Sequence, residues 1–287
     1  MRIDGKALSE TILTKLSDVV SKLTKAGVNP TMAVILVGDD AGSLSYIRQK
    51  QKAATRIGAN VIFDQMEKST TPEILASAIA HYNNDPSVHG LIVQRPVPLP
   101  GVGDILNSVT AGKDVDGFIP NSPFEVPVAR AVFTILEQIH SELTNAQLIH
   151  LPYLSWLNSQ KVAIIGRGET AGEPIAHAFQ KYDCATSIIH STTKNRDRIL
   201  KQASLIVSCV GKEHLLTKND IKPGTMLISV GFAKGADGKL HGDYDETDIA
   251  DTAAFYTPTP GGVGPINVAC LMQNLVDACI MNVDAHK

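Results

Sequence analysis

Short apolar runs rich in β-branched residues alternate with amphipathic stretches along almost the whole chain. The runs predict strands at residues 33–37, 61–63, 91–93, 162–165, 186–189, 205–209 and 226–230. Thr71 followed by Pro72 predicts the start of a helix between the second and third strands, because Thr caps helices and Pro suits the first helical position. Regular alternation of this kind is typical of parallel sheets in an α/β protein.

Residues 121–160 separate two sets of strands and follow helical spacing, so we expect them to be mainly helical. A chain of 287 residues is long enough for two α/β domains, each with its own core. We predict a catalytic domain formed by residues 1–138 with 265–287, and a Rossmann-like, doubly wound parallel domain formed by residues 139–264. An active-site cleft is expected between the two domains.

Residues 258–265 are the most constrained part of the chain, with three prolines and three glycines among them. Such a segment predicts a rigid loop that is neither helix nor central strand. An apolar helical pattern follows it directly, so bare backbone N–H groups of the loop could hold a flat or anionic ligand. An ordinary tight turn is the alternative interpretation.

A glycine-rich turn follows the predicted strand at 162–165 and leads into a helix. Gly166 and Gly168 match the first two glycines of the dinucleotide-binding fingerprint, and Ala171 occupies its third position. The pattern indicates close backbone approach to a pyrophosphate, although a structural strand–turn–helix remains the alternative. The predicted cofactor-binding residues are Gly166, Arg167, Gly168, Ala171, Gly172, His190, Ser191, Val210 and Gly211.

The strand that follows this turn ends in His190-Ser191-Thr192-Thr193 and lacks the acidic residue that holds the ribose of NAD. Arg167 could instead bind a 2′-phosphate through its planar guanidinium. We therefore predict NADP as the cofactor, held by Arg167 and Ser191. A solvated loop charge at Arg167 is the alternative.

A predicted helix at 43–57 carries the strongest signal of catalytic chemistry. Tyr46 and Lys50 lie on its apolar face, together with Ala53 and Ile57, whereas its other cations lie on the opposite side. A desolvated lysine has a lowered pKa and can act as a base, but a lysine whose ammonium reaches solvent is the alternative. Gln94 ends an apolar strand and is a candidate neutral partner for Lys50. Asp116, beside Gly117, could bind the edge of a heterocycle.

Composition narrows the class of protein further. The net charge is −3, from 26 basic and 29 acidic residues without long runs of one sign, so we expect neither a nucleic-acid nor a membrane partner. No stretch is predicted to be long enough to span a bilayer, and the start lacks an apolar signal core. The four cysteines lack metal-type spacing, so we expect buried free thiols, a cytoplasmic location and no metal.

Several motifs together resemble one family. They are Ile3-Asp4-Gly5-Lys6, Gly38-Asp39-Asp40 with Ser43-x-x-Tyr46-x-x-x-Lys50, Gly90-Leu91-Ile92-Val93-Gln94, Lys113-Asp114-Val115-Asp116-Gly117-Phe118, Gly166-Arg167, and the residues of 258–265. The motifs occur in this order, and over about residues 3–275 the chain resembles bifunctional methylenetetrahydrofolate dehydrogenase/methenyltetrahydrofolate cyclohydrolase. The resemblance implies NADP-dependent oxidation of 5,10-methylenetetrahydrofolate, followed by hydrolysis to 10-formyltetrahydrofolate.

The resemblance also implies roles for individual residues. Lys50 would be the catalytic lysine, Gln94 would tune it, and Asp116 would take part in catalysis and bind the pterin edge. Tyr46 would stack on the small-molecule folate substrate. The segment Pro260, Gly261, Gly262 and Val263 would contact substrate and cofactor. The last helix would return to the first domain, and the enzyme would be a homodimer.

Two other classes stay open at this point. The family usually has Ser where this chain has Gly168, and Asp where it has Ser229, so a homologue dominated by cyclohydrolase activity, or one that binds folate or nucleotide without turnover, is one alternative. A related two-domain dehydrogenase acting on shikimate is the other. It would need a Lys–Asp pair in its own motif context, which the sequence does not contain.

Overall fold

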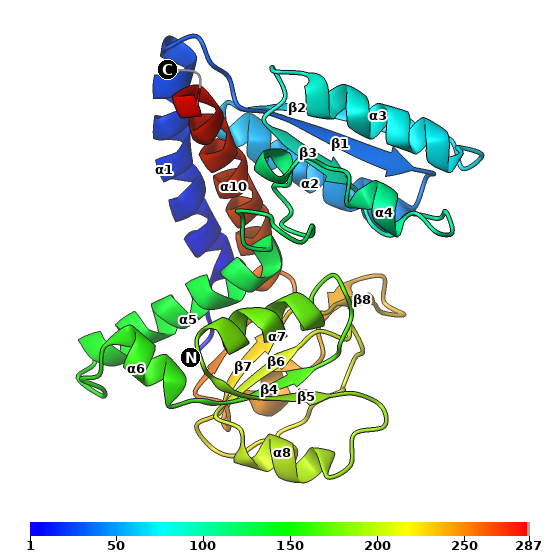
Figure 1. Ribbon diagram of the computed structural model, residues 1–287. Helices are drawn as coiled ribbons and strands as arrows, with labels where there is room; N and C mark the ends of the chain where they lie inside the picture. Colours follow the sequence, from blue (N-terminus) through cyan, green and yellow to red (C-terminus); the bar gives the residue numbers. More distant parts are fainter. Residues whose placement is uncertain (286–287) are drawn as a thin grey trace. The chain divides into compact units, whose positions relative to one another are not determined.

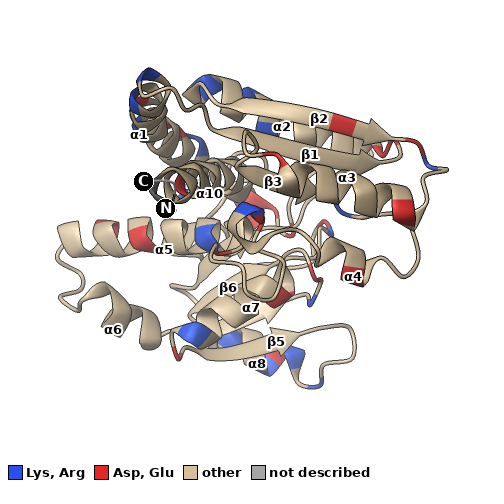
Figure 2. Ribbon diagram, turned by 45° about the horizontal axis from the view of Figure 1, so that its top comes forward, with Lys and Arg blue, Asp and Glu red and all other residues tan. Residues whose placement is uncertain are grey.

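The computed structural model describes residues 1–285, and the chain folds into two compact units (Figure 1). We name them after residues singled out above. The Lys50 unit contains Ser9–Pro127 and Val268–Lys287, and the Gly166 unit contains Met1–Leu8 and Val128–Asn267. We expected boundaries at 138/139 and 264/265, whereas the units divide at 127/128 and 267/268, and residues 1–8 lie with the Gly166 unit. Basic and acidic residues are mixed along both units (Figure 2).

A three-stranded parallel sheet forms the centre of the Lys50 unit. Its strands β1 (Thr31–Val37), β2 (Asn60–Met66) and β3 (Gly90–Val93) lie in the order β2-β1-β3. The helical elements with residues in this unit are α1 (Gly5–Lys25), α2 (Ala41–Ile57), α3 (Pro72–Asn84), α4 (Gly103–Leu106), the short 3₁₀ helix η1 (Ala111–Lys113) and α10 (Val263–Ala285). Thr71 caps α3 as predicted, by accepting a hydrogen bond from the backbone N–H of Ile74.

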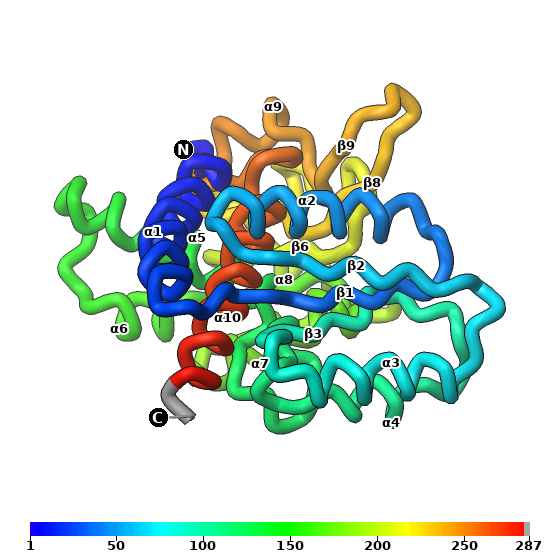
Figure 3. The backbone as a smooth tube through the Cα atoms, turned by 90° about the horizontal axis from the view of Figure 1, so that it is seen from above, coloured from blue at the N-terminus to red at the C-terminus, as the bar shows by residue number. Residues whose placement is uncertain are grey.

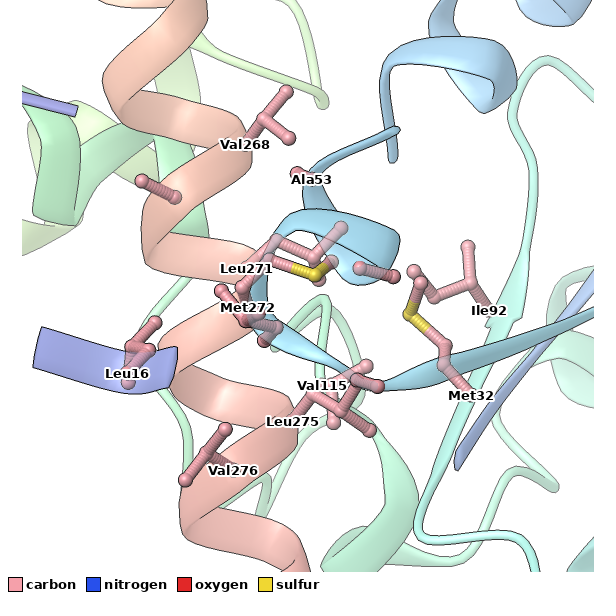
Figure 4. Close-up of a cluster of buried hydrophobic side chains, with 14 of the residues drawn as sticks. Leu16, Met32, Ala53, Ile92, Val115, Val268, Leu271, Met272, Leu275 and Val276 are labelled. Carbon is pink, nitrogen blue, oxygen red and sulfur yellow. The ribbon is translucent and has the colours of Figure 1, made fainter. Parts of the chain in front are cut away.

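Helices cover this sheet on both faces, because every residue of β1 is buried and successive side chains point to opposite sides. Met32, Val34 and Leu36 join a core cluster with residues of α1, α2 and α10. Figure 4 shows α10 side chains from Val268 to Val276 together with Leu16 of α1 and Met32 of β1, which belong to the same cluster. The alternate β1 residues Ala33, Ile35 and Val37 pack against α3 in a second cluster.

Helix α10 corrects one expectation from the sequence. Residues Val263–Val283 form a helix long and apolar enough to cross a membrane by length and composition, so the prediction that no stretch is long enough was wrong. However, 61% of its most apolar window is buried inside the protein. Its apolar side chains contact α1 in the core of the Lys50 unit, where the two helices run side by side (Figure 3). The apolarity of α10 is therefore explained by its place as a core helix.

A five-stranded parallel sheet forms the centre of the Gly166 unit. Its strands are β4 (Lys161–Ile165), β5 (Ala185–Ile189), β6 (Leu205–Ser208), β7 (Met226–Ser229) and β10 (Phe255–Tyr256), in the order β10-β7-β6-β4-β5. A separate antiparallel pair consists of β8 (Ala233–Lys234) and β9 (Leu240–His241). The helices are α5 (Pro127–Asn145), α6 (Tyr153–Asn158), α7 (Gly172–Lys181), α8 (Arg196–Gln202) and α9 (Glu246–Ile249).

The order of these strands confirms the predicted doubly wound fold. Strand β5 lies on one side of β4, and β6 lies on the other, so the winding direction reverses at β4. In open parallel sheets, ligands bind at the carboxyl ends of the strands at such a reversal. The turn that begins at Gly166 follows β4 directly and therefore occupies the position where a nucleotide is expected.

Two local features differ from what the sequence pattern predicts. The loop at 258–265 is shorter than predicted, because α10 already begins at Val263 and includes Pro265 in its first turn, where no intrahelical N–H bond is needed. Of the cysteines, Cys184, Cys270 and Cys279 are buried as expected, but Cys209 is partly exposed. All four are free thiols, and burial raises the pKa of Cys209 to about 12.

Candidate active site

Helix α2 presents Lys50 to the interior of the Lys50 unit. The helix starts at an Asp40 cap, whose carboxylate accepts from the N–H of Ser43 at 2.7 Å, and ends at Gly58 in the left-handed region. Lys50 is only 2% exposed, whereas Arg48, Lys52 and Arg56 on the same helix are exposed. The inward position predicted from helical spacing is therefore confirmed, and the ammonium does not reach solvent.

Gln94 is the direct partner of the buried lysine. Lys50 Nζ donates to Gln94 Oε1 at 3.1 Å, and Gln94 Nε2 in turn donates to the carbonyl of Arg95 at 2.9 Å. This second bond orients the amide so that its oxygen faces Lys50. A neutral acceptor of this kind accommodates either the amine or the ammonium of Lys50 without fixing its charge.

Asp116 and Tyr46 complete the cluster around Lys50. Asp116 Oδ2 lies 3.9 Å from Lys50 Nζ, with a side chain 21% exposed, and the ring centroid of Tyr46 lies 5.1 Å from the same nitrogen. Burial lowers the pKa of Lys50 from its ordinary value, and the charge of Asp116 opposes this effect only in part. The arrangement can thus provide an amine base beside a half-buried carboxylate.

The loop that carries Asp116 is held at several points. Lys113 is buried and donates to the carbonyls of Tyr82 at 2.9 Å and Asp85 at 2.7 Å. Asp114 accepts from the N–H of Ile119 at 3.0 Å, and burial raises the pKa of this carboxyl. The two neighbours that the sequence groups with Asp116 therefore support the loop.

Asn274 of α10 also holds this loop, and the sequence reasoning missed it. Its Nδ2 donates to the carbonyls of Val115 and Glu125, both at 2.9 Å, and the side chain is 1% exposed. These bonds fix both ends of the segment that contains Asp116. A polar residue inside the apolar pattern of α10 was the signal that could have revealed it.

Arg95 and Phe118 lie beside the cluster. The guanidinium carbon of Arg95 is 4.7 Å from the centroid of the Phe118 ring, in a cation–π contact. Arg95 follows Gln94 directly in the sequence, and this contact gives it a partner on the Asp116 loop. The contact joins the segment that follows Gln94 to the loop that carries Asp116.

The predicted nucleotide turn has the close backbone approach that a pyrophosphate site needs. Gly166 has φ +104°, and Gly172 is the first residue of α7. A Cβ on Gly172 would overlap the carbonyl group of Gly166, so the helix can start here only with glycine. Gly172 therefore makes the close packing contact that the fingerprint requires of its third residue, while Ala171, which occupies the third position in the sequence, is the residue before the helix.

The other predicted cofactor residues lie in loops that follow the two neighbouring strands. His190 and Ser191 follow β5, where the N–H of His190 donates to Thr193 Oγ1 at 2.9 Å and Ser191 is exposed. Val210 and Gly211 follow β6, and Val210 is 48% exposed. Because β5 and β6 flank β4, all three loops emerge at the carboxyl edge of the same sheet.

These loops fit a bound dinucleotide. Gly166 and Gly172 leave backbone bare at the N-terminus of α7, which suits a pyrophosphate. Arg167 and Gly168 are exposed in the same turn, and a Cβ on Gly168 would meet no atom within 4 Å. The turn therefore has both a cationic group and space for a ligand.

The glycine–proline loop before α10 belongs to the Gly166 unit. Pro260 is exposed, Gly261 has φ +104°, and Gly262 and Val263 are buried. The carbonyl of Gly262 lies against Gly5 so closely that a Cβ there would overlap it. Gly5, which the motif Ile3-Asp4-Gly5-Lys6 contains, is thus required for this loop to close.

The structure brings the predicted residues into two groups. Tyr46, Lys50, Gln94 and Asp116 form one cluster in the Lys50 unit. The cofactor residues and the loop at 260–263 belong to the Gly166 unit. Within residues 1–285 no group of three or more His, Cys, Asp or Glu side chains is arranged to hold a metal ion.

Comparison with known proteins identifies one family for both parts of the chain. The family model for the catalytic domain of tetrahydrofolate dehydrogenase/cyclohydrolase matches residues 3–116, and the model for the NAD(P)-binding domain of the same family matches residues 129–283. The bifunctional protein FolD of Lacticaseibacillus casei (strain BL23) is 36% identical over 277 residues, which cover 96% of each chain.

Solved structures of similar proteins have the same fold over nearly the full length. The bifunctional enzyme FolD from Campylobacter jejuni is 30% identical and has a TM-score of 0.88, covering 98% of this chain and 99% of its own. The Trypanosoma brucei enzyme, solved in complex with NADP cofactor and inhibitor, is 26% identical with a TM-score of 0.85 and covers 99% and 98%. The chain belongs to the tetrahydrofolate dehydrogenase/cyclohydrolase family.

Proposed function

We propose that this protein oxidises 5,10-methylenetetrahydrofolate with NADP and hydrolyses the resulting methenyl cation to 10-formyltetrahydrofolate. The observation that carries the proposal is the buried Lys50, hydrogen-bonded to Gln94 and 3.9 Å from Asp116. Its lowered pKa makes the neutral amine accessible, as a base requires. The same cluster would serve both half-reactions, because both act on one folate ring system.

Hydrolysis is the step for which Lys50 is suited. Water adds to the methenyl carbon and loses a proton to the Lys50 amine. The bond from that carbon to one of its two nitrogens then breaks, and the leaving nitrogen takes the proton back from Lys50. The hydroxyl on the carbon releases its remaining proton to solvent as it becomes the carbonyl of the formyl group, which stays on the other nitrogen. A positioned proton relay typically contributes about 10²–10⁴-fold. Gln94 keeps the amine oriented throughout, since its own amide is held by the carbonyl of Arg95.

Substrate binding is assigned to side chains that border Lys50 and to the glycine–proline loop. We propose that the ring of Tyr46 stacks on the folate and that the half-buried carboxylate of Asp116 accepts hydrogen bonds from the pterin edge. Pro260, Gly261, Gly262 and Val263 would contact substrate and cofactor. The exposed Pro260 and the partly exposed Gly261, which has no side chain, support this assignment.

NADP supplies the hydride acceptor for the oxidation. The turn from Gly166 to Gly172 would bind the pyrophosphate at the N-terminus of α7, with Gly168 and Ala171 completing the turn. Arg167 and Ser191, both exposed, would bind the 2′-phosphate, and His190, Val210 and Gly211 would line the neighbouring loops. Hydride transfer requires the nicotinamide and the one-carbon bridge of the substrate to be held in near-attack geometry.

Replacing Lys50 tests the proposal directly. Lys50→Met should reduce the hydrolysis of methenyltetrahydrofolate by about 10²-fold or more, with NADP affinity unchanged, because the proton relay is lost and the nucleotide loops are untouched. Lys52→Met is the matched control, since Lys52 lies on the same helix but is exposed. Both half-reactions should be followed by the methenyl absorbance change, with NADP and with NAD.

Three results would count against the proposal. Near-normal hydrolysis by Lys50→Met would remove Lys50 from the mechanism. Wild-type protein that binds folate and NADP without turnover would indicate a binding homologue. Hydrolysis without NADP-dependent oxidation would indicate an enzyme dominated by cyclohydrolase activity, which the absence of a side chain at Gly168 would then explain.

We further propose a homodimer and a cytoplasmic location. The family resemblance supports dimerisation through the Gly166 unit, and β5 lies at an edge of its sheet, with Ile188 40% exposed. Light scattering coupled to size-exclusion chromatography would measure the mass in solution. A monomer at micromolar concentration would contradict the dimer.

A further inference from the structure

A short segment that the sequence does not single out underlies the proposed NADP loops. Asp243 follows strand β9 and is 0% exposed. Its Oδ1 accepts from the backbone N–H of Lys212 at 2.7 Å, and its Oδ2 accepts from that of Val210 at 3.3 Å. One buried carboxylate thus engages two amides of the loop that follows β6.

The same segment contacts the loops after two further strands. The N–H of Asp243 donates to Ser229 Oγ at 3.1 Å, and Ser229 Oγ donates to the carbonyl of Gly231 at 3.1 Å, in the loop after β7. The hydroxyl of the adjacent Tyr244 donates to the carbonyl of Thr257 at 2.7 Å, just after β10. Residues 243–244 therefore connect three loops at the carboxyl edge of the sheet.

The position of the Val210 loop also decides how much room the nucleotide turn has. A Cβ on Gly166 would lie 3.3 Å from the carbonyl oxygen of Cys209 and 3.4 Å from a methyl carbon of Val210. A small outward or inward movement of this loop would therefore widen or close the space beside the pyrophosphate turn. Loops that must hold a ligand without reorganising need such a fixed support.

We propose that Asp243 is a positioning residue for NADP, acting through the loop at 210–212. This inference rests on the proposed NADP site. Because Asp243 accepts from Val210 and Lys212, those amides are engaged with the carboxylate, and the pyrophosphate is left to the turn at 166–172. The exposed Val210 side chain then faces an uncharged part of the cofactor. Ser229, where the family usually has Asp, bridges Asp243 to the neighbouring loop.

Asp243→Asn tests the inference, because the amide keeps the shape but can accept from only one of the two N–H groups. We expect the Kd of NADP, measured by titration calorimetry, to rise by about tenfold or more. The dehydrogenase KM for NADP should rise in parallel, while the rate and KM of methenyltetrahydrofolate hydrolysis stay within about twofold of wild type.

Asp245→Ala is the matched control for a purely structural effect. Asp245 lies two residues away and caps α9 by accepting from the N–H of Thr247, so its loss should lower the Tm without changing NADP affinity. Asp243→Asn with a lowered Tm but wild-type NADP affinity would overturn the inference. Equal losses of NADP affinity and hydrolysis would overturn it as well, since they would indicate general damage.

A variant that fails to fold and a wild-type protein that binds no NADP have different consequences. If Asp243→Asn fails to fold, Ser229→Ala takes its place: about threefold weaker NADP binding with normal hydrolysis supports the inference, and unchanged binding overturns it. If the wild-type protein itself binds no NADP, the proposed function fails, and that result is visible before any variant is measured.

Discussion

At the scale of single residues, the protonation of Lys50 is the property on which the chemistry depends. Burial lowers its pKa, and the charge of Asp116 raises it, so the two effects act in opposite directions on one amine. Gln94 contributes a hydrogen bond without a charge. Changing the charge of either neighbour should therefore shift the pH dependence of hydrolysis in a direction that can be stated in advance.

Asp116→Asn and Gln94→Glu should shift the pH profile of kcat for hydrolysis in opposite directions. Removing the Asp116 charge lowers the pKa of Lys50 further, so the rise of kcat with pH moves to lower pH. Placing a carboxylate at position 94 raises that pKa, so the rise moves to higher pH and kcat at pH 7 falls by about tenfold or more. Shifts in the same direction in both variants would contradict a base at Lys50.

Lys50→Met should also change stability. Because the pKa of Lys50 is lowered on folding, the unfolded chain binds more protons, and the wild type loses stability as pH falls below the ordinary lysine value of 10.5. The variant should therefore be more stable at pH 7, by about 1 kcal/mol or more, and this gain should vanish above that ordinary value. Urea unfolding of both proteins at several pH values measures this difference in stability. A difference that is the same at every pH would contradict a lowered pKa of Lys50.

At the scale of elements, α10 positions the site as well as filling the core. Most of its buried residues are apolar, but Asn274 holds the two ends of the Asp116 loop. The tight packing of that loop supports the same conclusion: a Cβ on Gly90 would lie 2.9 Å from Val115 and 3.1 Å from Leu275. The helix therefore affects substrate binding through the loop, at a distance from the reacting atoms.

Asn274→Leu should weaken folate binding selectively. The substitution preserves volume but removes both hydrogen bonds, so we expect a loss of about 1–3 kcal/mol in stability and a rise of about tenfold in the KM for folate substrates. NADP affinity should stay at the wild-type value. In an Asp116→Asn background the effect of Asn274→Leu on KM should largely disappear. Full additivity of the two changes would argue that Asn274 has no influence on Asp116.

Elements were predictable from the sequence where the pattern was local. All seven predicted strands are present, and the helix predicted at 43–57 is α2 (Ala41–Ile57). Strand β10 was not predicted, because Phe255–Tyr256 is too short to show a period and pairs with β7, some 30 residues earlier in the chain. Helix α1 was not predicted either. The first turn of α10 was missed because proline and glycine usually indicate a loop.

At the scale of the whole molecule, the two units divide the chemistry. The Lys50 unit contains Tyr46, Lys50, Gln94 and Asp116, which are assigned to folate, and the Gly166 unit contains the residues assigned to NADP together with the loop at 260–263, which is assigned to both ligands. Stabilisation by each ligand should therefore respond to different substitutions. This separation gives a simple measurement of the cofactor preference.

NADP should raise the stability of the protein by mass action. At about 100 times its Kd the gain is about 2.7 kcal/mol, and it should persist in Lys50→Met. Arg167→Ser should reduce the gain from NADP and leave the smaller gain from NAD unchanged, because only NADP has the 2′-phosphate. Thermal unfolding with each nucleotide checks this expectation. A preference for NAD over NADP of about tenfold would contradict the assignment of Arg167 and Ser191.

The sequence by itself determined the α/β class, the family, the cofactor and the inward position of Lys50. These follow from short patterns: strand runs, helical spacing between Tyr46 and Lys50, and a glycine turn after a strand. The tertiary structure alone decided what holds these residues in place. Asn274 lies 159 residues from Val115, and Asp243 lies 33 residues from Val210, so no local pattern links either residue to the loop that it supports. Hydrogen bonds between distant segments depend on how the chain folds back, which spacing along the sequence does not encode.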